Sequence, residues 1–169
     1  MRKVAMFIAF QDFRDEEYLE PKKILEAEGI KVDTVSTAKG KARGKFGAIA
    51  NVDKIIAEIN PSDYDALCLV GGAGCLEHLD NGLVYDIFRQ AFNENKLIGS
   101  ICISPVILAR AGILKGKKAT VWPDGADELK AGGAIYTGAD IEMDGKIITA
   151  NGPSPAKKYA QKLVRELGE

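Results

Sequence analysis

Cys102 is the residue in this 169-residue sequence whose type and position best suit it to chemistry. It lies between an apolar run, residues 97–101, and Ser104-Pro105, which have the pattern of a helix N-cap and first helical residue. Unpaired N–H groups and the helix dipole favour an anion at such a place. We therefore expect a lowered thiol pKa and a nucleophilic, oxidisable thiolate. The alternative is a small buried core residue.

Two further features could assist a thiol. Glu17 falls in the first turn of a helix expected over residues 15–28, where a carboxylic acid could donate or accept protons; it could instead only complement the helix dipole. Gly71-Gly72 follows the apolar run 66–70 and would let the backbone approach a reacting centre and present an N–H to an oxyanion. Glycine pairs at strand ends also serve tight turns.

The remaining candidate nucleophiles and metal ligands do not have the pattern of any other type of site. His78 is the only histidine, so no imidazole follows Cys102 as a glutamine amidotransferase of class I would require. A metal site of Cys75, His78 and Cys102 lacks an evident fourth ligand, and no P-loop or dinucleotide-binding glycine motif is present. We expect neither metal nor cofactor, and we interpret Cys68 as a core residue.

The composition limits which binding partners and which cellular compartment we expect. The formal charge is −1, from 23 basic and 24 acidic residues, so we expect no nucleic-acid partner and no attraction to anionic membranes. The apolar N-terminal segment, residues 1–10, is too short to span a bilayer and lacks a signal-peptide cleavage site. Three cysteines favour a reducing, cytoplasmic location. We interpret the basic residues of segment 39–45 as a solvated turn; they are Lys39, Lys41, Arg43 and Lys45.

Short apolar runs and helical patterns alternate along the chain. The runs 4–10, 66–70 and 97–101 are typical of parallel strands covered on both faces. Another strand is expected over 30–35, after a helix that ends at Gly29. Residues 141–143 and 146–148 flank Asp144-Gly145 and predict an antiparallel hairpin, and a final helix should start at Ser154-Pro155.

These elements predict one domain, residues 1–169, with an α/β fold. We expect a three-layer, flavodoxin-like sandwich, similar to class I glutamine amidotransferases, with a mostly parallel sheet and a small antiparallel hairpin. Ligands bind such sheets beyond the carboxyl ends of the strands. The rule selects three loops, residues 11–17, 71–78 and 102–105.

Five ordered motifs resemble the ThiJ/PfpI superfamily, which includes the Parkinson's-disease protein deglycase and the so-called intracellular proteases. The resemblance covers essentially the whole chain. Its motifs are Phe13-Arg14-Asp15-Glu16-Glu17 with Pro21, Tyr64-Asp65-Ala66 leading to Gly71-Gly72, Cys102-Ile103-Ser104-Pro105, segment 111–120, and Thr149-Ala150-Asn151-Gly152-Pro153.

The resemblance implies roles for four positions. Cys102 would be the nucleophile on a strained elbow, Glu17 the carboxylic acid bonded to it, and Gly72 and Ile103 the donors of oxyanion-hole N–H groups. Activities in the family include cofactor-free glyoxalase chemistry, disputed deglycation, peptide hydrolysis and redox-dependent chaperone or sensor behaviour. Members commonly form homodimers or higher homo-oligomers, which we expect here as well.

Positions at which this chain departs from the family pattern limit which of the family's activities we expect. Ile103 stands where the protease-like branch has histidine, which argues against peptidase activity, and Ile103-Ser104 alters the pocket beside the thiol. Trp122 stands where several deglycase-type members carry a pocket histidine, and Arg14 where an acid is frequent. We expect a cysteine-dependent glyoxalase or hydrolase acting on small reactive carbonyl compounds. The alternatives are a redox sensor or stress chaperone switched by oxidation of Cys102 and, from fold alone, an FMN carrier.

Overall fold

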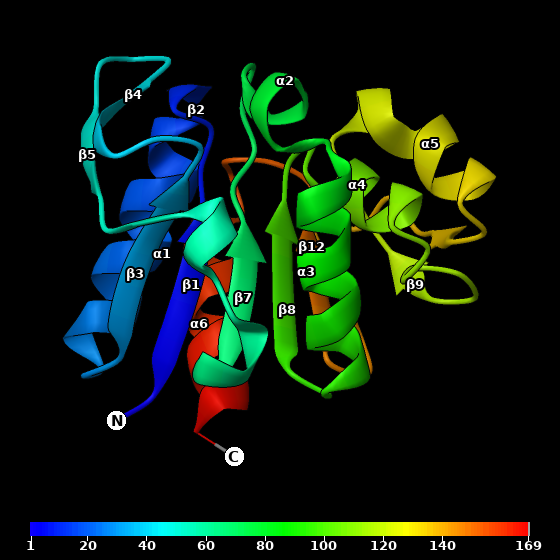
Figure 1. Cartoon of the computed structure of the whole chain (residues 1–169). Coiled ribbons are helices and arrows are strands. Elements are labelled where there is room, and N and C mark those ends of the chain that lie inside the picture. The colour runs from blue at the N-terminus through cyan, green and yellow to red at the C-terminus, as the bar shows by residue number, and fades with distance from the viewer. Residues whose placement is uncertain (169) are drawn as a thin grey trace.

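A seven-stranded sheet forms the centre of the computed structural model, which describes residues 1–168 (Figure 1). The strand order is β11-β12-β8-β7-β1-β3-β6. Neighbouring strands are parallel except for β11, which pairs antiparallel with β12 at one edge. The strands are β1 (Lys3–Phe7), β3 (Lys31–Ser36), β6 (Lys54–Ile55), β7 (Ala66–Leu69), β8 (Leu97–Ile101), β11 (Ile141–Asp144) and β12 (Ile147–Ala150).

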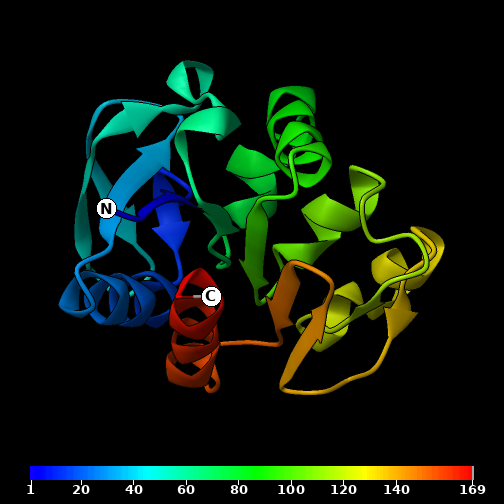
Figure 2. The same cartoon turned by 90° about the horizontal axis from the view of Figure 1, so that it is seen from below.

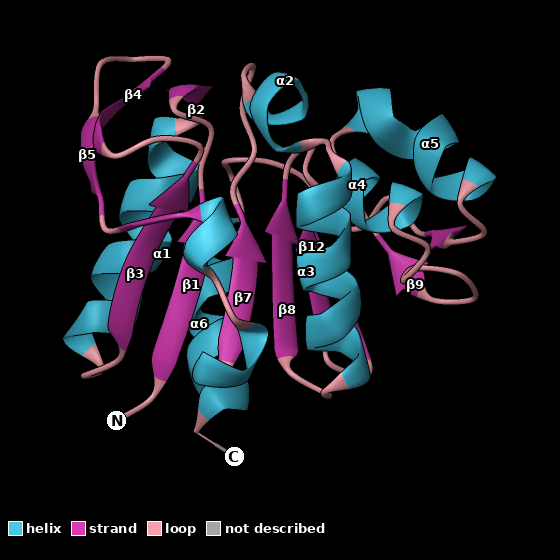
Figure 3. Cartoon of the chain, viewed as in Figure 1, coloured by secondary structure: helices cyan, strands magenta, loops and turns pink. Residues whose placement is uncertain are grey.

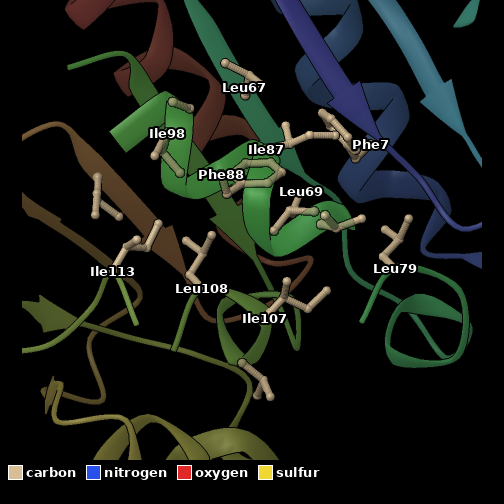
Figure 4. Packing of buried hydrophobic residues seen from close by; sticks show 14 of the residues in the cluster. Phe7, Leu67, Leu69, Leu79, Ile87, Phe88, Ile98, Ile107, Leu108 and Ile113 are labelled. Carbon is tan, nitrogen blue, oxygen red and sulfur yellow. The ribbon is translucent and has the colours of Figure 1, made fainter. Parts of the chain in front are cut away.

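Helices cover both faces of this sheet (Figure 2). Helices α1 (Asp15–Ala27) and α6 (Ala156–Leu167) pack on one face, and α3 (Gly82–Asn93) and α4 (Pro105–Arg110) on the other. Because side chains alternate along a strand, β1 contributes Val4 and Met6 to one core and Ala5 and Phe7 to the other. Figure 4 shows the core that contains Phe7, on the face covered by α3 and α4. There the Phe7 ring packs edge-on against the Phe88 ring, with 5.1 Å between the ring centroids.

Smaller elements surround the carboxyl ends of the parallel strands and one sheet edge (Figure 3). A three-stranded sheet has the order β2-β4-β5, and β9 pairs with β10. No helix among residues 1–168 is both long enough and apolar enough to cross a bilayer. The bounds are β2 (Gln11–Phe13), β4 (Gly40–Gly44), β5 (Ile49–Val52), β9 (Lys118–Ala119), β10 (Ile135–Tyr136), α2 (Cys75–Leu79), α5 (Ala126–Ala131), and the 3-10 turns η1 (Ile56–Glu58), η2 (Pro61–Asp63) and η3 (Pro123–Gly125).

The expected fold class is confirmed: the sandwich has three layers, a mostly parallel sheet and an antiparallel edge hairpin. Three local predictions were wrong. Residues 40–44 of the basic segment form strand β4 rather than a turn, although its four basic residues are solvent-exposed as expected. The expected loop 71–78 contains helix α2. In the hairpin, Asp144 still pairs with Ile147, so the turn itself is Gly145-Lys146.

Candidate active site

The three loops selected from the sequence meet at the carboxyl ends of β1, β7 and β8, at the top of Figure 1. Cys102 follows β8 directly, and Gly71 lies just beyond the end of β7. Glu17 reaches the same place from the first turn of α1, on one face of the sheet. The fold therefore brings together residues that are far apart in the sequence.

Cys102 has a backbone conformation that side chains rarely adopt, with φ of 65° in the left-handed region. Its N–H donates to the carbonyl of Ala150 at 2.9 Å, and its own carbonyl accepts from the Trp122 N–H at 2.7 Å. These bonds tie the elbow to the ends of two neighbouring segments. The surroundings thus hold the thiol in a strained turn.

Ser104 occupies the N-cap position of α4, as predicted, but its side chain stabilises the elbow instead of capping the helix. It has helical backbone angles and makes no capping bond to α4. Its buried hydroxyl instead accepts from the Ile101 N–H at 3.0 Å and lies 2.6 Å from the Ser100 hydroxyl. The carbonyls of Leu69 and Ile101, at 3.0 and 2.8 Å, are its acceptors. The hydroxyl therefore links the ends of β7 and β8 beneath the thiol.

The glycines after β7 are required by close backbone contacts. A Cβ on Gly71 would lie 2.5 Å from the Cβ of Cys102 and 2.6 Å from Oε1 of Glu17. A Cβ on Gly72, which has φ of 118°, would lie 2.4 Å from the backbone nitrogen of Arg14. Only glycine allows the thiol, the carboxyl and the first loop to approach this closely.

Glu17 and Cys102 form a coupled acid–thiol pair. The Glu17 side chain is fully buried, and neither carboxylate oxygen has a hydrogen-bond partner of good geometry among the described residues. Burial raises the pKa of Glu17 to about 7, although the nearby Cys102 thiol, Arg14 and the Gly71 backbone each lower it. Burial and the adjacent Glu17 carboxylate raise the pKa of Cys102 to about 12.

The sequence-based expectation of a lowered thiol pKa was therefore wrong in direction. The N–H groups of Ile103 and Gly72 lie against the sulfur and do lower its pKa, as expected for an electropositive elbow. Desolvation and a neighbouring negative charge outweigh them. The pair thus resists carrying two negative charges at once, and near neutral pH it holds at least one proton.

A cavity of about 370 Å³ opens in front of the thiol. Its walls are mostly apolar, and its two aromatic residues, Phe46 and Trp122, are 67% and 41% exposed. The Ile103 side chain, for which Gly125 leaves room, lines the wall where a histidine would bring a proton carrier. The lining residues are Arg14, Lys45, Phe46, Gly72, Ala73, Leu76, Cys102, Ile103, Trp122 and Asp124.

Asp15 positions the loop that carries Lys45 and Phe46, a role that the sequence did not indicate. Its buried carboxylate accepts the N–H of Phe46 at 3.0 Å and that of Ala48 at 2.8 Å. A Cβ on Gly44 would lie 2.6 Å from the same carboxylate, so glycine is needed there. Asp15 is one of three acidic residues in the first turn of α1, so no signal in the sequence distinguishes its contacts from those of its neighbours.

The other candidate residues lie outside the cavity wall. Cys68 and Cys75 are buried, and His78 lies in α2 without lining the cavity. Burial raises the pKa of both thiols, that of Cys68 to about 12. Among residues 1–168, no group of three or more His, Cys, Asp or Glu side chains is arranged to hold a metal ion.

Two curated relatives match nearly the whole chain. The uncharacterized protein MJ0967 of Methanocaldococcus jannaschii is 46% identical over 168 residues, 98% of this chain and 82% of that protein. Deglycase PH1704 of Pyrococcus horikoshii is 32% identical over 162 residues, 96% of this chain and 98% of that protein.

Solved structures share the same architecture. A ThiJ/PfpI domain protein from Brachyspira murdochii superposes with a TM-score of 0.95 at 32% identity, over 98% of this chain and 96% of that one. Drosophila melanogaster DJ-1beta superposes with a TM-score of 0.88 at 26% identity, over 98% of this chain and 90% of that one. The DJ-1/PfpI family model matches residues 2–166. The resemblance drawn from the sequence motifs is therefore confirmed, and the chain belongs to the DJ-1/PfpI family.

Proposed function

We propose that this protein is a cysteine-dependent enzyme of the glyoxalase or hydrolase kind that acts on small reactive carbonyl compounds. The observation that carries the proposal is the constellation at the elbow: a strained cysteine, a fully buried carboxyl with raised pKa against it, and two backbone N–H groups at the sulfur. The naming of relatives as deglycases supports activity on carbonyl adducts. A cavity of about 370 Å³ suits a small substrate.

The first step is addition of the thiol to a carbonyl carbon. The Cys102 sulfur bonds to the aldehyde carbon of a 2-oxoaldehyde while the thiol proton passes to Glu17, so no free thiolate is needed. The N–H groups of Gly72 and Ile103 stabilise the oxyanion that forms on the former carbonyl oxygen. Protonation of that oxygen by Glu17 gives a hemithioacetal.

The second step is an internal proton transfer. Glu17 removes the proton from the carbon bonded to sulfur and returns one to the adjacent carbon, while the hydroxyl proton on the first carbon's oxygen passes to the oxygen of the adjacent carbon. These transfers convert the hemithioacetal to a 2-hydroxy thioester. Water then cleaves the thioester, releasing a 2-hydroxy acid and restoring the thiol. Methylglyoxal and water thus become lactate, with no net oxidation and no cofactor. A carboxyl whose pKa is about 7 suits proton transfer in both directions near neutral pH.

The test is methylglyoxal consumption and lactate formation by the native protein and three variants. We expect Cys102→Ser and Glu17→Gln to lose at least about a hundredfold in kcat/KM, since each removes a reacting group. Cys68→Ala, which removes a buried thiol outside the cavity, serves as the matched control. In D₂O the lactate should carry deuterium at carbon 2. Turnover that survives in Cys102→Ser would overturn the proposal.

A redox role is the second candidate, and one observation favours it. Cys102 is half-buried and lines the cavity, whereas Cys68 and Cys75 are buried, so peroxide can reach this thiol selectively. Oxidation to the sulfinic acid would add two oxygens, with Glu17 as the adjacent hydrogen-bond partner. Mild peroxide should then add 32 Da to the peptide containing Cys102. A protein that turns over no carbonyl substrate and gains no such mass would have neither function.

A further inference from the structure

The two basic residues that line the cavity differ in whether they have an ion-pair partner. Arg14 is held by Glu16, with contacts of 3.0 Å from Nε and 2.9 Å from a terminal nitrogen. Lys45 also lines the cavity, and among residues 1–168 it has no ion-pair partner. One uncompensated cation therefore faces the space in front of Cys102.

The strand that leads to Lys45 adds to this positive charge. Lys41 and Arg43 lie on the exposed face of β4, and they too have no ion-pair partner among the described residues. Their cross-strand neighbours on β5, Asn51 and Ile49, are uncharged. The cations of this strand are thus available to attract an anion from solvent.

The position of Lys45 is fixed by the surrounding structure. Its N–H donates to the carbonyl of Phe13 at 2.9 Å, next to the acid-bearing helix. Asp15 holds the following residues through two N–H groups, and the Arg14 guanidinium lies 4.9 Å from the centre of the Phe46 ring. The backbone that carries Lys45 is therefore anchored on both sides.

We propose that the cavity selects reactive carbonyl compounds that bear an anionic group, and that Lys45 is the residue that recognises the anion. This inference rests on the proposed function, because it names the substrate class of the same site. The apolar wall formed by Phe46, Trp122 and Ile103 contacts the carbon chain between the reacting carbonyl and the anion. Asp124, the one acidic residue lining the cavity, comes from η3, and its negative charge disfavours an anion beside it and so favours placement of the anion at Lys45.

The first test does not depend on turnover. Iodoacetate and iodoacetamide differ in charge but little in size, and both alkylate Cys102. We divide the rate constant for iodoacetate by that for iodoacetamide, and we divide this ratio by the same ratio measured for glutathione at equal pH and salt. The result reports how strongly the surroundings of the thiol favour an anionic reagent. We expect Lys45→Gln to lower this ratio roughly three- to tenfold, as for removal of a nearby unit charge. Added salt should lower the ratio of the native protein as well.

Lys146→Gln is the matched control, because it removes the same charge from the amino-terminal end of β12, at the opposite end of the sheet. Its ratio should equal that of the native protein. A Lys45→Gln ratio that also equals the native value would overturn the inference, even if methylglyoxal is turned over. Conversely, a lowered ratio without any turnover would leave anion recognition standing and the proposed enzymatic function refuted.

The second test uses a matched pair of carbonyl substrates. The 2-oxoaldehyde 4,5-dioxopentanoate carries a carboxylate, and its methyl ester is neutral. We expect the native protein to show a kcat/KM for the acid at least about fivefold above that for the ester, and we expect this difference to be lost in Lys45→Gln. Equal values in the native protein, or an equal fall for both substrates in Lys45→Gln, would contradict the assignment.

Discussion

At the scale of single residues, the site depends on the proton that Glu17 and Cys102 share. Burial raises the pKa of both groups, and the Glu17 carboxylate raises that of Cys102 further, whereas the protonated Cys102 thiol lowers the pKa of Glu17 through its hydrogen bond. The elbow N–H groups act in the opposite direction but are weaker. The thiol is therefore suited to attack with concerted loss of its proton to the carboxyl, rather than as a preformed thiolate.

Removal of the Glu17 charge should lower the pKa of Cys102. In Glu17→Gln the carboxylate that disfavours the thiolate is absent, while the N–H groups of Gly72 and Ile103 remain. The thiolate absorbance near 240 nm, followed against pH, should rise at lower pH than in the native protein. Glu28→Gln, at the exposed end of α1, should leave the titration unchanged. An upward shift would mean that Glu17 stabilises the thiolate.

Alkylation of the folded protein should be confined to one cysteine. Cys68 and Cys75 are buried and their pKa values are raised by burial, whereas Cys102 faces the cavity. Brief treatment with iodoacetamide followed by peptide mass mapping should find the label on Cys102, and all three cysteines should react in denaturant. Equal labelling of Cys75 in the folded protein would contradict the packing of α2.

At the scale of elements, the wall of the cavity depends on how the β4–β5 loop is anchored to α1. Asp15 →Asn would replace one of two accepting oxygens with an NH₂ group that faces a backbone N–H. We expect the KM for a carbonyl substrate to rise about three- to tenfold, with kcat within about twofold, because the reacting groups stay in place.

Limited proteolysis provides the structural readout for Asp15→Asn, which should be cleaved faster than the native protein within residues 44–48. Asp63→Asn, an exposed change in η2, is the control and should alter neither KM nor cleavage. A fall in kcat with unchanged KM would show that Asp15 acts on the reacting groups instead.

The sequence predicted the helices and strands whose pattern of apolar and polar residues lies within the element itself. Continuous apolar runs identified β7 and β8, and the helical pattern ending at Gly29 identified α1. It missed β4, because a strand of alternating basic and small residues depends on partners from β2 and β5 for its hydrogen bonds. The hydrogen bonds of Ser104 were missed for a similar reason: it is the N-cap residue of α4, as predicted, but the partners of its hydroxyl lie on β7 and β8.

The sequence predicted where the candidate residues lie, but it did not predict the energetics of their ionisation. The types and spacing of Cys102, Glu17 and Gly72 placed them at the same end of the sheet, where the structure has them. The direction of the thiol pKa depends on how deeply the carboxyl is buried and how near it lies. Neither quantity can be obtained from residue order, because α1 must first pack against the sheet.

At the scale of the whole molecule, burial of Glu17 links stability to pH. Its pKa is raised from an ordinary 4.5 to about 7 in the folded state. Between these values the unfolded chain ionises the group and the folded chain does not, so this group's stabilisation is complete below about pH 4.5 and is lost as pH rises to about 7. A shift of this size corresponds to about 3 kcal/mol.

Glu17→Gln should therefore gain stability relative to the native protein as pH rises. We expect the difference in free energy of unfolding, from urea titrations at pH 4, 5.5 and 7.5, to grow by up to about 3 kcal/mol in favour of the variant and to level off above pH 7. Glu28→Gln should show no such trend. A constant difference across this range would mean that Glu17 titrates normally in the folded protein.

The left-handed backbone at Cys102 also constrains how this sequence can change over evolutionary time. A side chain at φ of 65° costs the folded state about 1 kcal/mol or more, which glycine would relieve. A descendant released from the need for a thiol would thus gain by drifting to glycine at this position. A cysteine at this position therefore carries a thermodynamic cost, so its replacement by glycine in a descendant sequence would indicate that no thiol chemistry is needed there.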